Sequence, residues 1–106
     1  MTMKFTYHQD PSHGWVEVSV KALKELGADL SEISAYSYCR PMTTETLVYL
    51  EEDGDVMVLI DALKERDIEF EFESVHTNHD CFCRSLPLRF PEWLATRSVL
   101  TFAATY

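Results

Sequence analysis

Residues 68–73 carry the strictest alternation of apolar and polar side chains in the chain. They read IEFEFE, and a period of two residues is typical of a β-strand with one buried face. The apolar positions are Ile68, Phe70 and Phe72, and the acidic positions are Glu69, Glu71 and Glu73. The pattern therefore predicts a strand that presents three glutamates on one side.

Two other segments have the spacing of amphipathic helices. In the first, apolar residues recur over 20–26, Ser19 can cap the N-terminus, and Gly27 suits the position after the last turn. In the second, over 56–63, apolar residues stand at i, i+3, i+4 and i+7. Each helix is expected to bury one side and expose the other.

The remaining apolar segments are short and are separated by turn-forming residues. Strands are expected at 5–7 (a short edge strand), at 15–18, at 33–40 and 45–51 as a hairpin, and at 81–84 as an antiparallel return. Short hairpin connections with two helices indicate an α+β fold. We expect an antiparallel sheet of about four to six strands with two helices packed on one face.

The chain is expected to form a single domain, residues 1–106. Residues 86–106 read as a C-terminal extension, because Pro87 and Pro91 break the pattern. Pro91 can start a short helix, and the apolar tail 99–106 has no clear period. That tail is a candidate subunit contact, so a homodimer is one expected state.

Negative charge is concentrated in one stretch. Residues 51–73 hold ten acidic and two basic side chains, so this stretch carries −8 of the chain's formal net charge of −9. Asp53 and Asp55 are expected in the first turn of the second helix, where the helix dipole favours carboxylates. No such local reason accounts for the glutamates of 69–73. An acidic surface attracts cationic partners and repels nucleic acid and anionic membranes.

The composition excludes several classes of protein. The apolar share of 46% fits a folded globular chain rather than a disordered one. No apolar run approaches the ~20 residues of a membrane span, and the first residues lack a signal-peptide pattern. Three cysteines are too few for a disulfide framework. We expect a cytoplasmic protein, in a bacterial host cell if the resemblance described below holds.

Seven carboxylates are the candidate electrostatic contacts to a basic partner, and three tyrosines are the candidate aromatic contacts. The carboxylates are Glu51, Glu52, Asp53, Asp55, Glu69, Glu71 and Glu73, and the tyrosines are Tyr36, Tyr38 and Tyr49. Tyrosines are enriched at protein interfaces. Stacking of bases would need cationic neighbours, so direct binding of nucleic acid is not expected.

Two other groups of residues suggest chemistry. His76, His79, Cys81 and Cys83 are metal-binding residue types, but their spacing is not that of a chelating motif. His8, Asp10 and His13 flank a turn without a convincing nucleophile nearby. We therefore expect no catalytic residue, no metal and no cofactor. A metal-dependent enzyme built on His76–Cys83 is the least favoured reading.

The runs HGWVEV (13–18), ISAYSY (33–38), VYLEEDGD (48–55) and ALKER (62–66) are similar to a family of small uncharacterised proteins of phages, plasmids and other bacterial mobile elements. The resemblance covers roughly residues 10–87 and transfers no catalytic or binding residue. By analogy with such genomic neighbours, it favours an anti-defence protein such as an anti-CRISPR.

The favoured function is therefore a non-enzymatic acidic module that binds another protein. It would occupy the basic nucleic-acid-binding groove of a host defence complex, as an anti-CRISPR inhibitor does, since glutamates spaced about 6.5–7 Å along one strand face resemble a row of phosphates. The alternative is a self-associating structural or regulatory protein of a mobile element.

Overall fold

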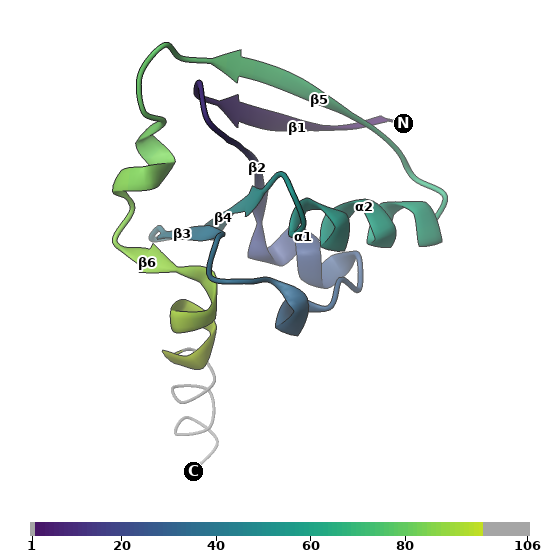
Figure 1. Ribbon diagram of the computed structural model, residues 1–106. Coiled ribbons are helices and arrows are strands. Elements are labelled where there is room, and N and C mark those ends of the chain that lie inside the picture. Colours follow the sequence, from purple (N-terminus) through teal and green to yellow (C-terminus); the bar gives the residue numbers. More distant parts are fainter. Residues whose placement is uncertain (1, 97–106) are drawn as a thin grey trace.

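The computed structural model of this chain describes residues 2–96 (Figure 1). Its strands are β1 (Thr2–Gln9), β2 (Gly14–Ser19), β3 (Tyr38–Pro41), β4 (Thr46–Glu51), β5 (Glu69–His76) and β6 (Leu88–Arg89). Its helices are α1 (Val20–Glu25), α2 (Val56–Glu65) and a helix over 90–96, with short 3₁₀ turns η1 (Leu30–Glu32) and η2 (Phe82–Ser85). The expected tail at 99–106 lies outside the described residues.

The six strands form one mixed sheet in the order β5-β1-β2-β4-β3-β6. The expected α+β class is confirmed. Four of the pairings are antiparallel, as expected, but β1 and β5 pair in parallel from Thr2↔Glu69 to Gln9↔His76. A wholly antiparallel sheet was therefore the wrong expectation. The reason is α2, which carries the chain from β4 to the far edge and returns it in the same direction, as a helical crossover does.

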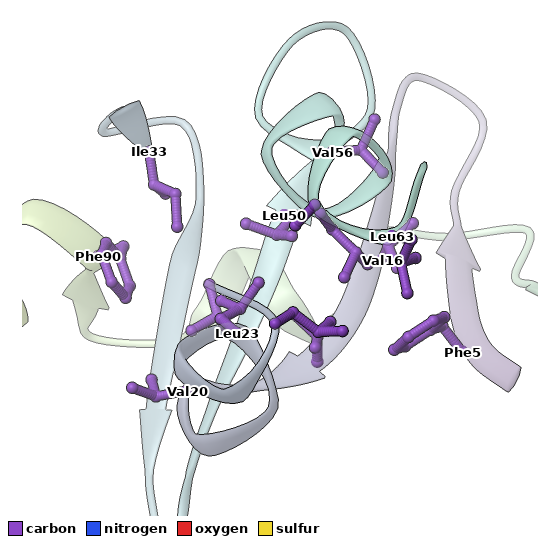
Figure 2. Packing of buried hydrophobic residues seen from close by; sticks show 14 of the residues in the cluster. Phe5, Val16, Val20, Leu23, Ile33, Leu50, Val56, Leu63 and Phe90 are labelled. Atoms are coloured by element: carbon purple, nitrogen blue, oxygen red, sulfur yellow. The ribbon is translucent and has the colours of Figure 1, made fainter. Parts of the chain in front are cut away.

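One face of the sheet packs against the helices. Val16 and Val18 of β2 and Val48 and Leu50 of β4 alternate onto this face and are buried with side chains of both α1 and α2. Leu23, Leu59 and Leu63 from the helices are fully buried. Figure 2 shows Leu23 and Leu63 among the packed side chains of this cluster. Phe90, at the start of the helix over 90–96, joins the same cluster. The expectation of two helices on one face is confirmed, and this helix adds a third element to that face.

The other sheet face is covered only in part. Trp15 and Tyr49 lie on it and are buried under Cys81 and Cys83 of the η2 segment. The return strand expected at 81–84 is therefore wrong. These residues form a 3₁₀ turn, because the amide of Cys81 donates to the carboxylate of Asp10, 3.0 Å away, instead of to a strand.

The strand expected at 33–40 is only half correct. β3 begins at Tyr38, and its pairing with β4 confirms the hairpin. Residues 34–37 form a turn because the hydroxyl groups of Ser34 and Ser37 donate to Asp55. Short polar side chains that bond elsewhere compete with a strand ladder in this way.

Both ends of α1 follow capping rules that are legible in the sequence. Ser19 accepts a hydrogen bond from the amide of Ala22, and Gly27 follows α1 with φ of 70°, so both expected caps are confirmed. After α2 the corresponding left-handed position is held by Asp67, with φ of 55°. Left-handed backbone costs an ordinary L-residue about 1–2 kcal/mol.

Replacement of Asp67 by glycine should therefore stabilise the fold. Part of the strain relief is offset by the greater unfolded-state entropy of glycine, so we expect Asp67→Gly to raise the free energy of unfolding by roughly 0.5–1 kcal/mol. Asp67→Ala should lower it, since alanine gains nothing in this conformation. Asp67→Asn, which removes only the charge, is the control. Urea unfolding followed by tryptophan fluorescence measures all three, and equal shifts for Gly and Ala would contradict the argument.

Candidate binding surface

The glutamates of β5 lie together on the exposed side of an edge strand. Glu69, Glu71 and Glu73 are all exposed, whereas Phe70 and Phe72 turn towards the helix-covered core. The expected glutamate strand face is confirmed, and we call it the glutamate face. Its position is the sheet face opposite α1 and α2, at one end of the strand order.

Within residues 2–96, a single lysine forms ion pairs with these glutamates. Lys4 of β1 lies 3.4 Å from Glu71 and 3.7 Å from Glu73, and Thr2 donates to Glu69 at 3.2 Å. The hydrogen bond and charge of Glu71 raise the pKa of Lys4. All these groups are exposed, so the ion pairs contribute little to stability. The glutamate face therefore keeps a net negative charge.

A pocket of about 550 Å³ opens on the same sheet face, further along the strand order. Five of the residues singled out from the sequence line it, namely Tyr36, Tyr38, Glu51, Asp53 and Asp55. His13, considered from the sequence only as a partner of Asp10, also lines it. The sequence reasoning missed the other lining residues, which are Trp15, Ser34, Gly54, Arg84 and Arg89. We call this site the aromatic pocket.

Strand pairing explains why distant residues meet in the aromatic pocket. Trp15 of β2 pairs with Glu51 of β4, and Tyr38 of β3 pairs with Arg89 of β6. The rings of Trp15 and Tyr38 lie 6.0 Å apart between centroids, and the Trp15 indole donates to the carbonyl of Tyr36 at 3.4 Å. No sequence signal separates a tryptophan that lines a pocket from one that only fills a core, and Trp15 does both.

Each of these two rings carries an arginine of the chain itself. The guanidinium of Arg84 lies 5.0 Å from the centroid of the Trp15 ring, and that of Arg89 lies 4.8 Å from the Tyr38 ring. Arg89 also donates to the carbonyl of Ala35 at 2.6 Å. These are cation–π contacts, which favour planar guanidinium groups.

Asp10 holds Arg84 in place. Its carboxylate is buried and accepts from Nε of Arg84 at 2.6 Å and from Nη2 at 3.2 Å. It also accepts from the amides of Ser12, His13 and Cys81. The guanidinium of Arg84, together with these amides, holds the pKa of Asp10 well below its usual range. The charge of Arg84 is therefore neutralised from behind the pocket.

Asp55 is buried, so its expected place on an exposed acidic surface is wrong. One carboxylate oxygen, Oδ2, accepts from the amide and hydroxyl of Ser34 (3.0 and 2.8 Å) and from the hydroxyl of Ser37 (2.5 Å). The residue is 6% exposed and directly precedes α2. It fastens the 34–37 turn to the start of the helix and forms part of the pocket wall.

Tyr49 is also misplaced by the sequence reasoning. Its side chain is fully buried under η2, with the rings of Phe82 and His8 at 5.4 and 5.7 Å. Burial raises the pKa of Tyr49 to about 12. A partner cannot reach this ring, so Tyr49 is a packing residue and not an aromatic contact.

Glu52 and Asp53 lie beside the pocket mouth with His13. Among the described residues, these three form the one group of three or more His, Cys, Asp or Glu residues whose ligand atoms all lie within 4.8 Å of one another. Tyr7 donates to Glu52, and burial together with this contact raises the pKa of Tyr7 to about 12. Within residues 2–96, no such group is formed by His76, His79, Cys81 and Cys83, because the two cysteines are buried and the two histidines are exposed. The metal centre considered there is not assembled.

A second acidic region lies on the helix side of the sheet. A groove of about 520 Å³ between η1 and α2 has no basic lining residue in the described part of the chain. Its acidic lining residues are Asp29, Glu32, Asp61 and Glu65, together with Asp55, which it shares with the aromatic pocket. The acidic stretch is thus divided between two sides of the molecule. Each side provides a charge-matched control for the other.

Comparisons with known proteins leave the family open. No family model matches the chain, no curated protein is similar to it, and no solved structure matches its fold. The resemblance to mobile-element proteins therefore stays a prediction. Among residues 2–96, no helix is both long enough and apolar enough to cross a membrane.

Removal of the Asp10 charge should destabilise the protein in a pH-dependent way. Asp10→Asn keeps one acceptor oxygen and replaces the other by an NH2 donor. It can therefore accept either from the donors at Oδ2 (Cys81 and Nε of Arg84) or from those at Oδ1 (Ser12, His13 and Nη2 of Arg84), but not from both sets, and we expect a loss of roughly 2–3 kcal/mol at pH 7. The pKa of Asp10 is lowered in the folded state, so the stabilisation is present above the unfolded-state value near 4 and is lost as pH falls below it.

Urea unfolding of the wild type and Asp10→Asn at a series of pH values measures this effect. The difference between the two should shrink steadily below about pH 4. Asp61→Asn, an exposed change of equal charge on α2, is the control and should be close to neutral. A difference that stays constant down to pH 2 would contradict the role of the Asp10 charge.

Proposed function

We propose that this protein is a non-enzymatic acidic module that binds a partner with a basic surface. The observation that carries the proposal is the glutamate face, because three exposed carboxylates stand in a row on an edge strand with Lys4 as their neighbouring cation. The fold does not require them. Any polar residue satisfies a solvent-facing strand position, so the repeated choice of glutamate calls for a reason outside local structure.

Mutual repulsion makes this choice unfavourable in the isolated chain. Glutamates on alternate positions of one strand lie about 6.5–7 Å apart, and like charges at that separation repel, modestly in water and more strongly near a protein surface. A basic partner would convert this repulsion into attraction. Acidic positions on an edge strand also oppose edge-to-edge pairing of two copies, which favours a heterologous partner over self-association.

The finer part of the proposal is inhibition of a nucleic-acid-binding machine. A row of carboxylates has a repeat of the same order as a row of phosphates, so the glutamate face can compete for an Arg/Lys groove. The sequence resemblance to mobile-element proteins adds the class of partner, a host defence complex such as a CRISPR effector. The chain's net charge of −9 argues against direct binding of nucleic acid.

Burial of the thiols supports a role without catalysis. Burial raises the pKa of Cys39 to about 12, and burial together with the neighbouring Cys81 raises the pKa of Cys83. Thiols with such pKa values are poor nucleophiles at neutral pH. Cys39 lies in the helix-side core, and Cys83 packs on Trp15 and Tyr49 on the opposite face of the sheet. Both thiols are fully buried.

Charge reversal on the glutamate face should abolish capture of the partner. We expect the tagged wild type to retain a basic protein from bacterial lysate at about 50 mM salt and to lose most of it at about 500 mM, because screening shortens the range of the field. The double variant Glu69→Lys, Glu71→Lys should lose it at both. The captured protein, identified by mass spectrometry, should then release bound nucleic acid when wild-type protein is added.

The double variant Asp61→Lys, Glu65→Lys is the matched control. It makes the same change of charge on the exposed side of α2, on the helix side of the sheet. It should retain capture. If instead this control loses the partner and the β5 variant keeps it, the acidic groove on the helix side is the binding surface. If neither variant matters, or if capture survives high salt, charge-led binding is wrong.

A further inference from the structure

We infer that the aromatic pocket is a receptor for one arginine side chain of the partner. This deepens the proposed function, since it assumes a basic partner, but it rests on different residues. The glutamate face would supply long-range attraction, and the aromatic pocket would supply a specific anchor. Three features of the pocket point to this ligand: its charge, the side chains of its walls, and the stacking of Arg84 and Arg89 on aromatic rings.

The first step is the charge of the pocket. Glu51, Asp53 and Asp55 line it, and none of them has an ion-pair partner among residues 2–96. Of the two arginines in the lining, Arg84 is neutralised by the bidentate contact with Asp10. Arg89 is the remaining cation against three carboxylates. The pocket therefore carries an excess of negative charge.

The second step is Asp55, a carboxylate that is 6% exposed. Its three hydrogen bonds from Ser34 and Ser37 all reach Oδ2, and in the described part of the chain no hydrogen bond to Oδ1 is formed. Buried carboxylates are usually paired with a cation. The start of α2 favours the negative charge here through the helix dipole but supplies no counter-ion. One oxygen of a rigidly held, buried carboxylate is thus left for an incoming donor, on a residue that lines both the aromatic pocket and the helix-side groove.

The third step is an exposed aromatic ring in the pocket wall. Tyr36 is 72% exposed, the largest exposed fraction among the large apolar and aromatic side chains described, and it stands at the pocket beside Tyr38. An exposed tyrosine near carboxylates provides a stacking surface for a planar cation. Tyrosine, tryptophan and arginine are also the residues that dominate binding energy at interfaces.

The fourth step identifies the cation as a guanidinium. The pocket already contains two guanidinium groups on aromatic rings, Arg84 on Trp15 and Arg89 on Tyr38. A third arginine, from the partner, would use Tyr36 in the same manner and donate two hydrogen bonds to the carboxylates. Lysine lacks both the plane and the fork of donors. A bare metal ion would leave most of the roughly 550 Å³ unfilled and has its own candidate ligands at His13, Glu52 and Asp53.

The test uses three small amides with the full-length protein. N-acetyl-arginine amide, its neutral isostere N-acetyl-citrulline amide, and N-acetyl-lysine amide are titrated while backbone amides and the Trp15 indole are followed by NMR. We expect saturable shifts at Gly54, Ser34 and the indole with arginine, with a Kd on the order of 1 mM. Lysine should bind at least about fivefold more weakly. Citrulline should not bind.

Two single variants locate the site. Tyr36→Ala and Asp53→Asn, both exposed changes, should each weaken arginine amide at least about fivefold. Asp61→Asn, in the acidic groove on the helix side, should leave the Kd unchanged. If citrulline binds as well as arginine, or if both pocket variants leave the Kd unchanged, the inference is wrong.

A titration with zinc chloride alone covers the competing occupant. If zinc saturates the site at micromolar concentration, with shifts centred on His13, and arginine amide does not bind, the pocket mouth is a metal centre and the inference is overturned. The variant Glu69→Lys, Glu71→Lys keeps the two proposals apart. It should bind arginine amide normally, so loss of partner capture with intact arginine binding separates the glutamate face from the pocket.

Discussion

The buried carboxylate of Asp10 is the constraint on which the open sheet face depends. It stands in the turn between β1 and β2 and accepts hydrogen bonds from Cys81 and Arg84, which are more than 70 positions away in sequence. A buried charge without partners would be strongly destabilising, so the η2 segment has to return to this point. That return lays Cys81 and Cys83 over Trp15 and Tyr49 and sets Arg84 on the indole ring. The packing of Cys81, Cys83 and Phe82 on Trp15 and Tyr49 completes the contact of η2 with the sheet.

The position of η2 divides that face into two regions of different character. At one end the glutamate face is open, flat and solvated, with its charges on an edge strand. At the other end the aromatic pocket is concave, and its charges are held by neighbouring groups, as Asp55 is by Ser34 and Ser37. Solvated charges act over distance and are screened by salt, whereas partly buried charges act at contact and resist screening. The two regions therefore suit successive stages of one encounter, attraction first and specific docking second.

The acidic stretch of 51–73 does not form a single surface. Its acidic residues have at least three different positions and roles. Asp55 fastens a turn, and Asp61 and Glu65 border a groove beside α2. The glutamates of β5 face away from both helices. A helix followed by a strand sends consecutive acids to opposite sides of a sheet. Net charge along a sequence is thus a poor guide to the field of a folded chain, and only the alternation within β5 identifies a face directly.

Local patterns in the sequence determined much of this protein. The caps at Ser19 and Gly27, the apolar stripe of α2, the two faces of β5 and the pairing of β3 with β4 were all predictable, because each depends on residues close together in the chain or on a period of two or 3.6. Tertiary structure alone decided the parallel pairing of β1 with β5, the burial of Asp55 and Tyr49, and the assembly of the aromatic pocket. These depend on contacts such as Asp10 with Arg84 and Ser37 with Asp55, whose partners are set by how the helices and strands pack. A pattern of neighbours shows that a side chain faces inward or outward, but not which distant side chain it will meet there.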